Sequence, residues 1–139
     1  MKDLLPLPNR DDRSLRWWVH ESGTRWVNSV RRFHKELLAS VSHPIIENAS
    51  LGTITRNLHS SQPGVFLWEI NRKNLVECVD RLSQTLWSNP NHLQLIACDR
   101  LNDSQRIALS EFNIACFLDQ PEDMIRLKPI FEGYFARIG

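Results

Sequence analysis

Apolar and polar positions along the chain follow two periods, a short one typical of strands and a longer one typical of helices. The clearest short run is Gly64–Ile70, in which only Glu69 carries a charge. A short apolar run that is entered through turn residues and followed by a helical pattern predicts a central strand of a parallel sheet, buried on both faces. Glu69 then lies at the carboxyl end of that strand, where open α/β sheets place ligands and chemistry.

Four more apolar runs predict strands, over residues 15–19, 42–49, 93–98 and 114–118. A segment with helical periodicity follows each of the five strands. The apolar residues that define these helices are Trp26, Val30, Phe33 and Leu37; Leu51, Ile54 and Leu58; Leu75, Val79, Leu82 and Leu86; Ile107, Ala108 and Phe112; and Phe131, Tyr134, Phe135 and Ile138. This alternation predicts a three-layer α/β sandwich, doubly wound around a five-stranded parallel sheet with right-handed crossovers.

Single residues refine the pattern at both ends of the domain. Trp17 and Trp18 are adjacent in the first strand, so they point to opposite faces, and we expect helices to cover both. Pro129 cannot lie in the middle of a helix without the loss of a hydrogen bond. The last helix is therefore predicted to begin at about Lys128, and residues 122–127 are predicted to form a separate short turn.

Length and charge exclude several classes of protein. The chain has 139 residues, which fits one domain over residues 15–139 after a polar, proline-containing tail over residues 1–14. Its net charge of +1 gives no global field that favours nucleic acid or an anionic membrane. No segment is apolar enough to span a bilayer or to serve as a signal peptide, so we expect a cytosolic protein with reduced cysteines.

The order and spacing of the elements from Leu15 to Ile138 resemble the receiver domain of two-component response regulators. The resemblance is clearest over residues 46–52 and 64–70, and Gln120-Pro121 resembles the family's Lys-Pro after the fifth strand. It implies a flavodoxin-like sheet in the strand order 2-1-3-4-5. It also implies a site at the carboxyl edge of the sheet, where receivers use an aspartate to accept a phosphoryl group.

The four chemical elements of this site, which are the acid pair, the acceptor, the hydroxyl and the lysine, are all changed in this chain. The residues at these positions are His20, Glu21, Glu69, Cys98 and Gln120, with Ala97 in place of Cys98 if the register slips by one. One carboxylate is missing from the pair that holds Mg²⁺, the acceptor is one methylene longer, the hydroxyl is absent and the lysine is replaced by an amide. Phosphoryl transfer depends on these groups and on their tight placement. We therefore expect a degenerate receiver-like module with no catalytic residue, metal or cofactor, which acts through a protein partner without phosphorylation.

Glu69 allows two interpretations. As a fixed negative group at the acceptor position, it could hold the end of the sheet permanently in an activated arrangement. Alternatively, it caps the next helix or pairs with a cation.

Two other functions use residues of the same edge. Convergence of His20, Glu69 and Cys98 would suggest a small enzyme with nucleophilic chemistry, such as a Cys-based hydrolase, although the fold gathers polar residues there for topological reasons. The Ser22-Gly23-Thr24 turn could receive an anion at the start of the first helix, as in a flavodoxin-type phosphate or nucleotide binder. In the simpler interpretation, Ser22 or Thr24 is an ordinary helix cap.

The expected partner surface is the face formed by the fourth helix, the fifth strand and the last helix, which receivers often use to dimerise. Its charges are mixed, which suits the polar rim of a specific interface. The candidate interface residues are Arg106, Glu111, Asp119, Arg126 and Lys128. We expect a homodimer through this face, and the sequence does not identify any other partner.

Overall fold

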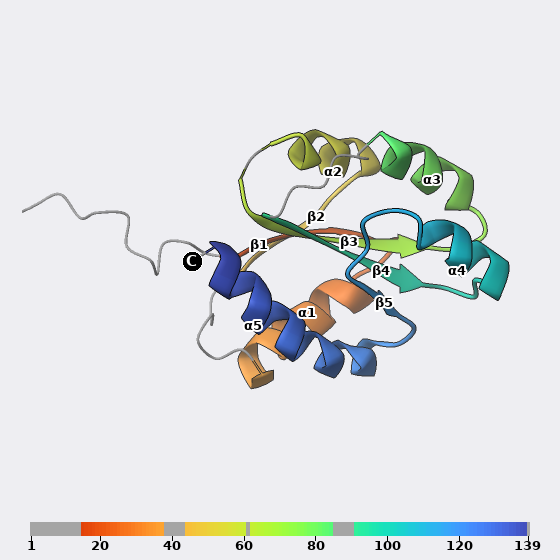
Figure 1. Ribbon diagram of the computed structural model, residues 1–139. Helices are drawn as coiled ribbons and strands as arrows, with labels where there is room; N and C mark the ends of the chain where they lie inside the picture. Colours follow the sequence, from red (N-terminus) through yellow and green to blue (C-terminus); the bar gives the residue numbers. More distant parts are fainter. Residues whose placement is uncertain (1–14, 38–43, 61, 85–90, 139) are drawn as a thin grey trace, which may run out of the picture.

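In the computed structural model of the protein, strands and helices alternate around one central sheet (Figure 1). The structure describes residues 15–37, 44–60, 62–84 and 91–138. The elements are β1 (Arg16–His20), α1 (Arg25–Leu37), β2 (Ile45–Asn48), α2 (Leu51–Leu58), β3 (Gly64–Ile70), α3 (Leu75–Ser83), β4 (His92–Cys98), α4 (Asp103–Leu109), β5 (Cys116–Leu118), the 3-10 helix η3 (Pro121–Arg126) and α5 (Leu127–Ile138). All strand pairs are parallel, in the order β2-β1-β3-β4-β5, which confirms the predicted flavodoxin-like arrangement.

Helices cover both faces of the sheet. In Figure 1, α1 and α5 lie on one face, and α2, α3 and α4 lie on the other. The central strand β3 has six buried residues out of seven, with Glu69 half-buried, and every residue of β4 is buried. These two strands pair along their whole length, from Gly64 and His92 to Ile70 and Cys98. The predicted central strand is therefore confirmed, with its charge at the carboxyl end.

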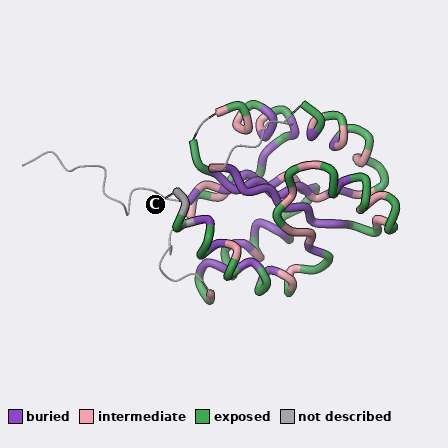
Figure 2. The backbone as a smooth tube through the Cα atoms, in the orientation of Figure 1, coloured by how far each residue is buried: buried purple, intermediate pink, exposed green. Residues whose placement is uncertain are grey.

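The sheet separates two hydrophobic cores, which Figure 2 shows as the buried strands and the inward faces of the helices. Trp17 belongs to the core under α1 and α5, and Trp18 belongs to the core under α2 and α3. Both are buried, as the alternation of side chains along a strand requires. Among the described residues, no helix is long and apolar enough to cross a membrane.

Aromatic side chains connect the helices to the sheet through their polar atoms. The indole N–H of Trp17 donates to Nε2 of His34 on α1, at 2.9 Å. The hydroxyl of Tyr134 on α5 donates to the carbonyl of Asn91 at 2.6 Å, next to the start of β4. Because both aromatic side chains are fully buried, these bonds satisfy groups that would otherwise be costly to bury.

The structure differs from the sequence prediction mainly at the short elements. The second and fifth strands are shorter than predicted, and α4 ends at Leu109, its buried residue. Ile107 is 65% exposed and Ala108 is also exposed, so they do not form the inward face of α4. The predicted short turn before the last helix is the 3-10 helix η3.

Some predictions fall outside what the structure describes. They concern the tail over residues 1–14, the first two residues of the predicted second strand, Leu86 with the end of the third helix, and the side chains of Phe135 and Ile138.

Gly64, the first residue of β3, lies directly against a tryptophan ring. A Cβ at this position would overlap the ring of Trp18, which stacks on Phe66 with 4.8 Å between ring centroids. Overpacking a core costs about 1–3 kcal/mol, so we expect Gly64→Ala to lower the free energy of unfolding in urea by that amount.

Gly133 on α5 provides the matched control. A Cβ there meets nothing within 4 Å, so Gly133→Ala is expected to stabilise the helix by about 0.5–1 kcal/mol. Effects of the same sign and size at both glycines would contradict the close packing of Trp18 on Gly64.

Candidate functional site at the carboxyl edge of the sheet

The carboxyl ends of β1, β3 and β4 lie side by side at one edge of the sheet. His20 pairs with Trp68, and Glu69 pairs with Ala97, so the strand ends are nearly level. The loops that leave these ends lead into α1, α3 and α4. The candidate residues at these strand ends thus share one edge, as parallel topology requires.

Glu21 directly follows β1, and its carboxylate caps α1. Its two oxygens accept hydrogen bonds from the backbone N–H groups of Trp26 and Val27, each at 2.8 Å. These groups belong to the first turn of the helix, where backbone donors lack partners within the helix and a negative charge is favoured. Glu21 is only 8% exposed. Its buried carboxylate therefore stabilises the start of α1.

Thr24 holds the N-cap position of α1, because its backbone carbonyl accepts a bond from the N–H of Asn28 at 2.9 Å. The prediction that the side chain of Ser22 or Thr24 caps this helix is corrected, because the first N–H groups donate to Glu21 instead. The side-chain cap is therefore Glu21, which lies between the end of β1 and the turn. It also bears on the suggested anion site, because Glu21 already occupies the N–H groups that an external phosphate would need. The structure therefore gives no support to a phosphate or nucleotide site at the start of α1.

Glu69 is held by the loop between β1 and α1. Its Oε1 accepts a hydrogen bond from the backbone N–H of Ser22 at 3.3 Å. Its backbone carbonyl accepts a bond from Nδ2 of Asn74, at 3.0 Å. In the described part of the chain, the Glu69 side chain neither caps α3 nor forms an ion pair with a cation, so neither form of the simpler interpretation applies.

The register selects between the two candidates for the hydroxyl position. Glu69 pairs with Ala97, whereas Cys98 pairs with Ile70. Ala97 packs in the core under α1 and α5, and Cys98 packs in the core on the opposite face. The residue beside Glu69 is therefore Ala97, which offers no hydroxyl to a phosphate.

The groups of the suggested Cys-based site make separate contacts. The Nδ1 of His20 donates to the backbone carbonyl of Ala49, at 3.0 Å. Burial raises the pKa of the Cys98 thiol above its ordinary value, although the charge of Arg106 acts in the opposite direction. A protonated thiol is a poor nucleophile. Among the described residues, no hydrogen bond or ion pair joins His20, Glu69 and Cys98.

The edge does not fit the Mg²⁺ site that its fold family implies. Mg²⁺ requires oxygen ligands, usually from one or two carboxylates with free coordination positions. Both oxygens of Glu21 are engaged by α1, and His20 takes the place of a second acid. Within the described ranges, no group of three His, Cys, Asp or Glu side chains could hold a metal ion.

Gln120 follows β5 and is exposed. Its backbone N–H donates to Oδ2 of Asp123 at 3.0 Å, which helps to begin η3. An uncharged amide at this place cannot form an ion pair with a phosphoryl group.

The predicted interface residues also make contacts within the chain. Arg106 on α4 forms an ion pair with Asp119, which links α4 to the end of β5. Arg126 donates to the carbonyl of Phe117 at 3.0 Å, on the edge strand β5. Glu111 and Lys128 are exposed. Ile107 on α4 is 65% exposed, which the sequence pattern does not predict because the pattern assigns Ile107 to the inward side of the helix.

Comparisons with known proteins identify the fold but no closer relationship. No family model matches the chain, and no curated protein matches it. Four chains of solved structures match, and three of them, each with probability 1.00, are described below.

The first of these structures is the CheY-like protein TadZ from Pseudomonas aeruginosa, with a TM-score of 0.58 and 15% identity over 86% of this chain and 94% of that chain. A CheY-like response regulator from Mesorhizobium loti has a TM-score of 0.58 and 13% identity over 88% and 99%. The pilus assembly protein CpaE from Caulobacter crescentus has a TM-score of 0.59 and 14% identity over 85% and 92%. The chain thus has the fold of CheY-like receiver domains, and similarity at this level of identity concerns the fold.

The capping role of Glu21 can be tested by its removal. We expect Glu21→Ala to lower the free energy of unfolding by about 1–3 kcal/mol, because two backbone N–H groups lose a charged acceptor. Glu21→Gln keeps one acceptor oxygen, so it should lower the free energy of unfolding by less than Glu21→Ala does. Urea denaturation followed by tryptophan fluorescence measures both.

Glu47→Ala is the control for this series. Glu47 forms a 3.6 Å ion pair with Arg16, and their side chains are 47% and 42% exposed. Exposed pairs contribute about 0–1 kcal/mol. If Glu21→Ala lowered the free energy of unfolding as little as Glu47→Ala does, the capping role of Glu21 would be contradicted.

Proposed function

We propose that the protein is a receiver-like interaction module that acts in the cytoplasm through protein contacts and without phosphorylation. The observation that carries the proposal is the double hydrogen bond from α1 to the Glu21 carboxylate. A receiver needs that acid for Mg²⁺, and here it stabilises the fold. Ala97 beside the acceptor position and uncharged Gln120 support the same conclusion.

The proposal extends to Glu69. Its contact with the Ser22 N–H connects the end of β3 to the loop before α1. This connection needs no covalent modification, so Glu69 would hold the edge in one signalling arrangement permanently.

The partner surface in this proposal is the face formed by α4, β5 and α5, with a second copy of the chain as the partner. Exposed Ile107 on α4 supports this choice, because a large apolar side chain that is exposed in the free chain is typical of an interface core. The neighbouring Arg106–Asp119 ion pair would then contribute to a polar rim.

Chemical phosphorylation tests the central part of the proposal. We expect no gain of one phosphoryl group in intact mass after incubation with Mg²⁺ and acetyl phosphate. Trp68 precedes Glu69 in β3, so its fluorescence should also stay unchanged. Glu69→Asp restores an ordinary acceptor but should remain unmodified, because Glu21, Ala97 and Gln120 still do not support the transfer. A phosphorylated wild-type protein would overturn the proposal.

Light scattering tests the dimer. We expect a concentration-dependent dimer that Ile107→Asp weakens at least about tenfold, because a carboxylate would be buried without a partner. Val76→Asp on α3 is the matched control, since Val76 is 80% exposed on another helix. A wild-type monomer at high concentration would contradict the proposed face.

The role of Glu69 has its own test in the same assay. If Glu69 maintains a dimerising arrangement, Glu69→Gln should weaken the dimer while the unfolding midpoint changes little, because an amide oxygen still accepts the Ser22 N–H. A dimer of unchanged affinity would show that the charge of Glu69 has no signalling role.

A further inference from the structure

His34 on α1 is a histidine inside a hydrophobic core. It is 1% exposed. Aromatic rings surround it: the ring centroids of Trp17, Phe33 and Phe131 lie 5.7, 5.7 and 6.4 Å from its own. These rings belong to β1, α1 and α5, so the imidazole lies where three elements on this face of the sheet meet.

The hydrogen bond from Trp17 determines the protonation state of this imidazole. An indole N–H can only donate, and it donates to Nε2 of His34 at 2.9 Å. Nε2 therefore carries no proton, and the ring is neutral. A proton on Nε2 would oppose the indole N–H and would place a charge in an apolar core. The packing of α1 on β1 thus excludes the imidazolium form of His34.

The other titratable groups near this core do not respond to mild acid in the same way. Tyr134 and Cys116 belong to the core or pack against it, and such side chains stay neutral as the pH falls. Burial raises the pKa of the Cys116 thiol, which keeps it protonated. The buried carboxylate of Glu21 lies at the opposite end of α1, where it caps the helix. The charged residues beside His34 and its ring contacts are half-buried or exposed, and they are Arg16, Arg31, Lys35, Glu36, Lys128 and Glu132.

His92 is the other buried histidine in the described part of the chain, and its contacts differ. Its Nε2 bonds to the carbonyl of Gln62 at 2.9 Å, and its ring packs against Phe66 in the other core. A carbonyl keeps this bond when the ring is charged. Burial lowers the pKa of His92, whereas the carbonyls of Gln62 and Ser60 raise it. His92 therefore excludes a proton less strictly than His34 does.

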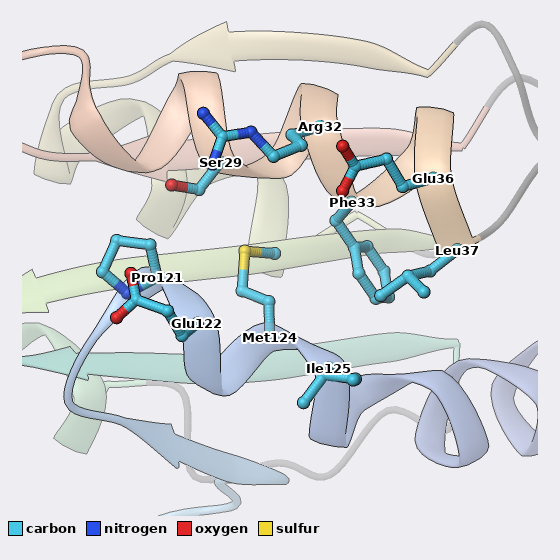
Figure 3. A pocket seen from close by; sticks show the side chains of 9 residues that line it. All are labelled: Ser29, Arg32, Phe33, Glu36, Leu37, Pro121, Glu122, Met124 and Ile125. Carbon is cyan, nitrogen blue, oxygen red and sulfur yellow. The ribbon is translucent and has the colours of Figure 1, made fainter.

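A groove of about 280 Å³ separates α1 from η3 on the same face of the sheet (Figure 3). Phe33 and Leu37 line it from α1, and Met124 lines it from η3. An unfilled groove lacks packing contacts, so η3 holds this part of α1 less firmly than a filled interface would. The bond between Trp17 and His34 thus contributes a larger share of the attachment of α1.

We propose that His34 is a pH switch, which holds the C-terminal half of α1 on the sheet at neutral pH and releases it in mild acid. The imidazole of an open chain takes up a proton at about pH 6.5, whereas the closed arrangement excludes it. The open form therefore binds more protons, and the closed form loses stability as the pH falls below that point. This inference does not depend on the proposed dimer or on the loss of phosphorylation.

Urea unfolding near pH 7.5 and near pH 5.5 tests the switch. We expect the unfolding constant of the wild type to rise about tenfold more over this range than that of His34→Gln. The glutamine oxygen can accept the indole N–H, but the amide does not titrate. His59→Gln, at an exposed histidine, is the matched control and should keep the full pH dependence of the wild type. An equal pH dependence in the wild type and His34→Gln would overturn the proposal.

NMR of the wild-type chain covers the case in which His34→Gln does not fold. The ¹⁵N resonance of Nε2 distinguishes an unprotonated ring nitrogen from a protonated one, and we expect it to stay unprotonated in the closed form down to pH 5.5. Amide hydrogen exchange, corrected for the intrinsic effect of pH, should show lower protection at Phe33 and Leu37 in acid while β3 and β4 stay protected. A His34 ring that takes up a proton while the Trp17 indole resonance and the α1 amides stay unchanged would overturn the switch. Equal loss of protection in α1, β3 and β4 would overturn the local release of α1.

Discussion

The link between β1 and α1 is a carboxylate that accepts two backbone hydrogen bonds, and the organisation of the whole carboxyl edge depends on it. Glu21 leaves the strand and turns back onto the first turn of α1, where the N–H groups of Trp26 and Val27 have no partners within the helix. The negative charge also complements the helix dipole. This single side chain orients α1 over the core that contains Trp17 and the central strand.

In the function that we propose, the same contact explains how a receiver fold can persist without the chemistry of a receiver. A fold depends on buried area, register and satisfied polar groups, whereas a catalytic site depends on groups that remain free to bind a ligand. Here Glu21 and Glu69 both bond to backbone N–H groups of the β1–α1 region. The acids that remain at the edge therefore stabilise the loop that a phosphorylated receiver would rearrange.

The sequence predicts the sheet well because β3 and β4 are apolar runs bounded by turns, and such runs have few alternatives in an alternating chain. It does not predict the cap of α1, because Ser22 and Thr24 are the usual capping types and the return of Glu21 depends on the shape of the loop. The choice between Ala97 and Cys98 likewise needs the register of β4 against β3. The groove beside α1 depends on η3, whose packing against Phe33 no local pattern encodes.

Ile107 on α4 and Ile125 on η3 are both large, exposed apolar side chains, and they lie in different surroundings. Ile107 lies on α4 beside an ion pair that is already closed, and this suits a symmetric contact with a polar rim. Ile125 lies at the margin of a groove whose charged lining residues are Arg32, Glu36 and Glu122.

The most direct test is a Mg²⁺ titration followed through the backbone amide resonances of Ser22, Trp26 and Val27. These three N–H groups donate to Glu69 and Glu21, so they report any withdrawal of either carboxylate. Our account predicts that their chemical shifts stay constant to millimolar Mg²⁺, because both oxygens of Glu21 are already engaged. Saturable shifts of all three resonances would show that Glu21 and Glu69 are available to a metal. That result would contradict the claim that these carboxylates stabilise the fold through their bonds to backbone N–H groups.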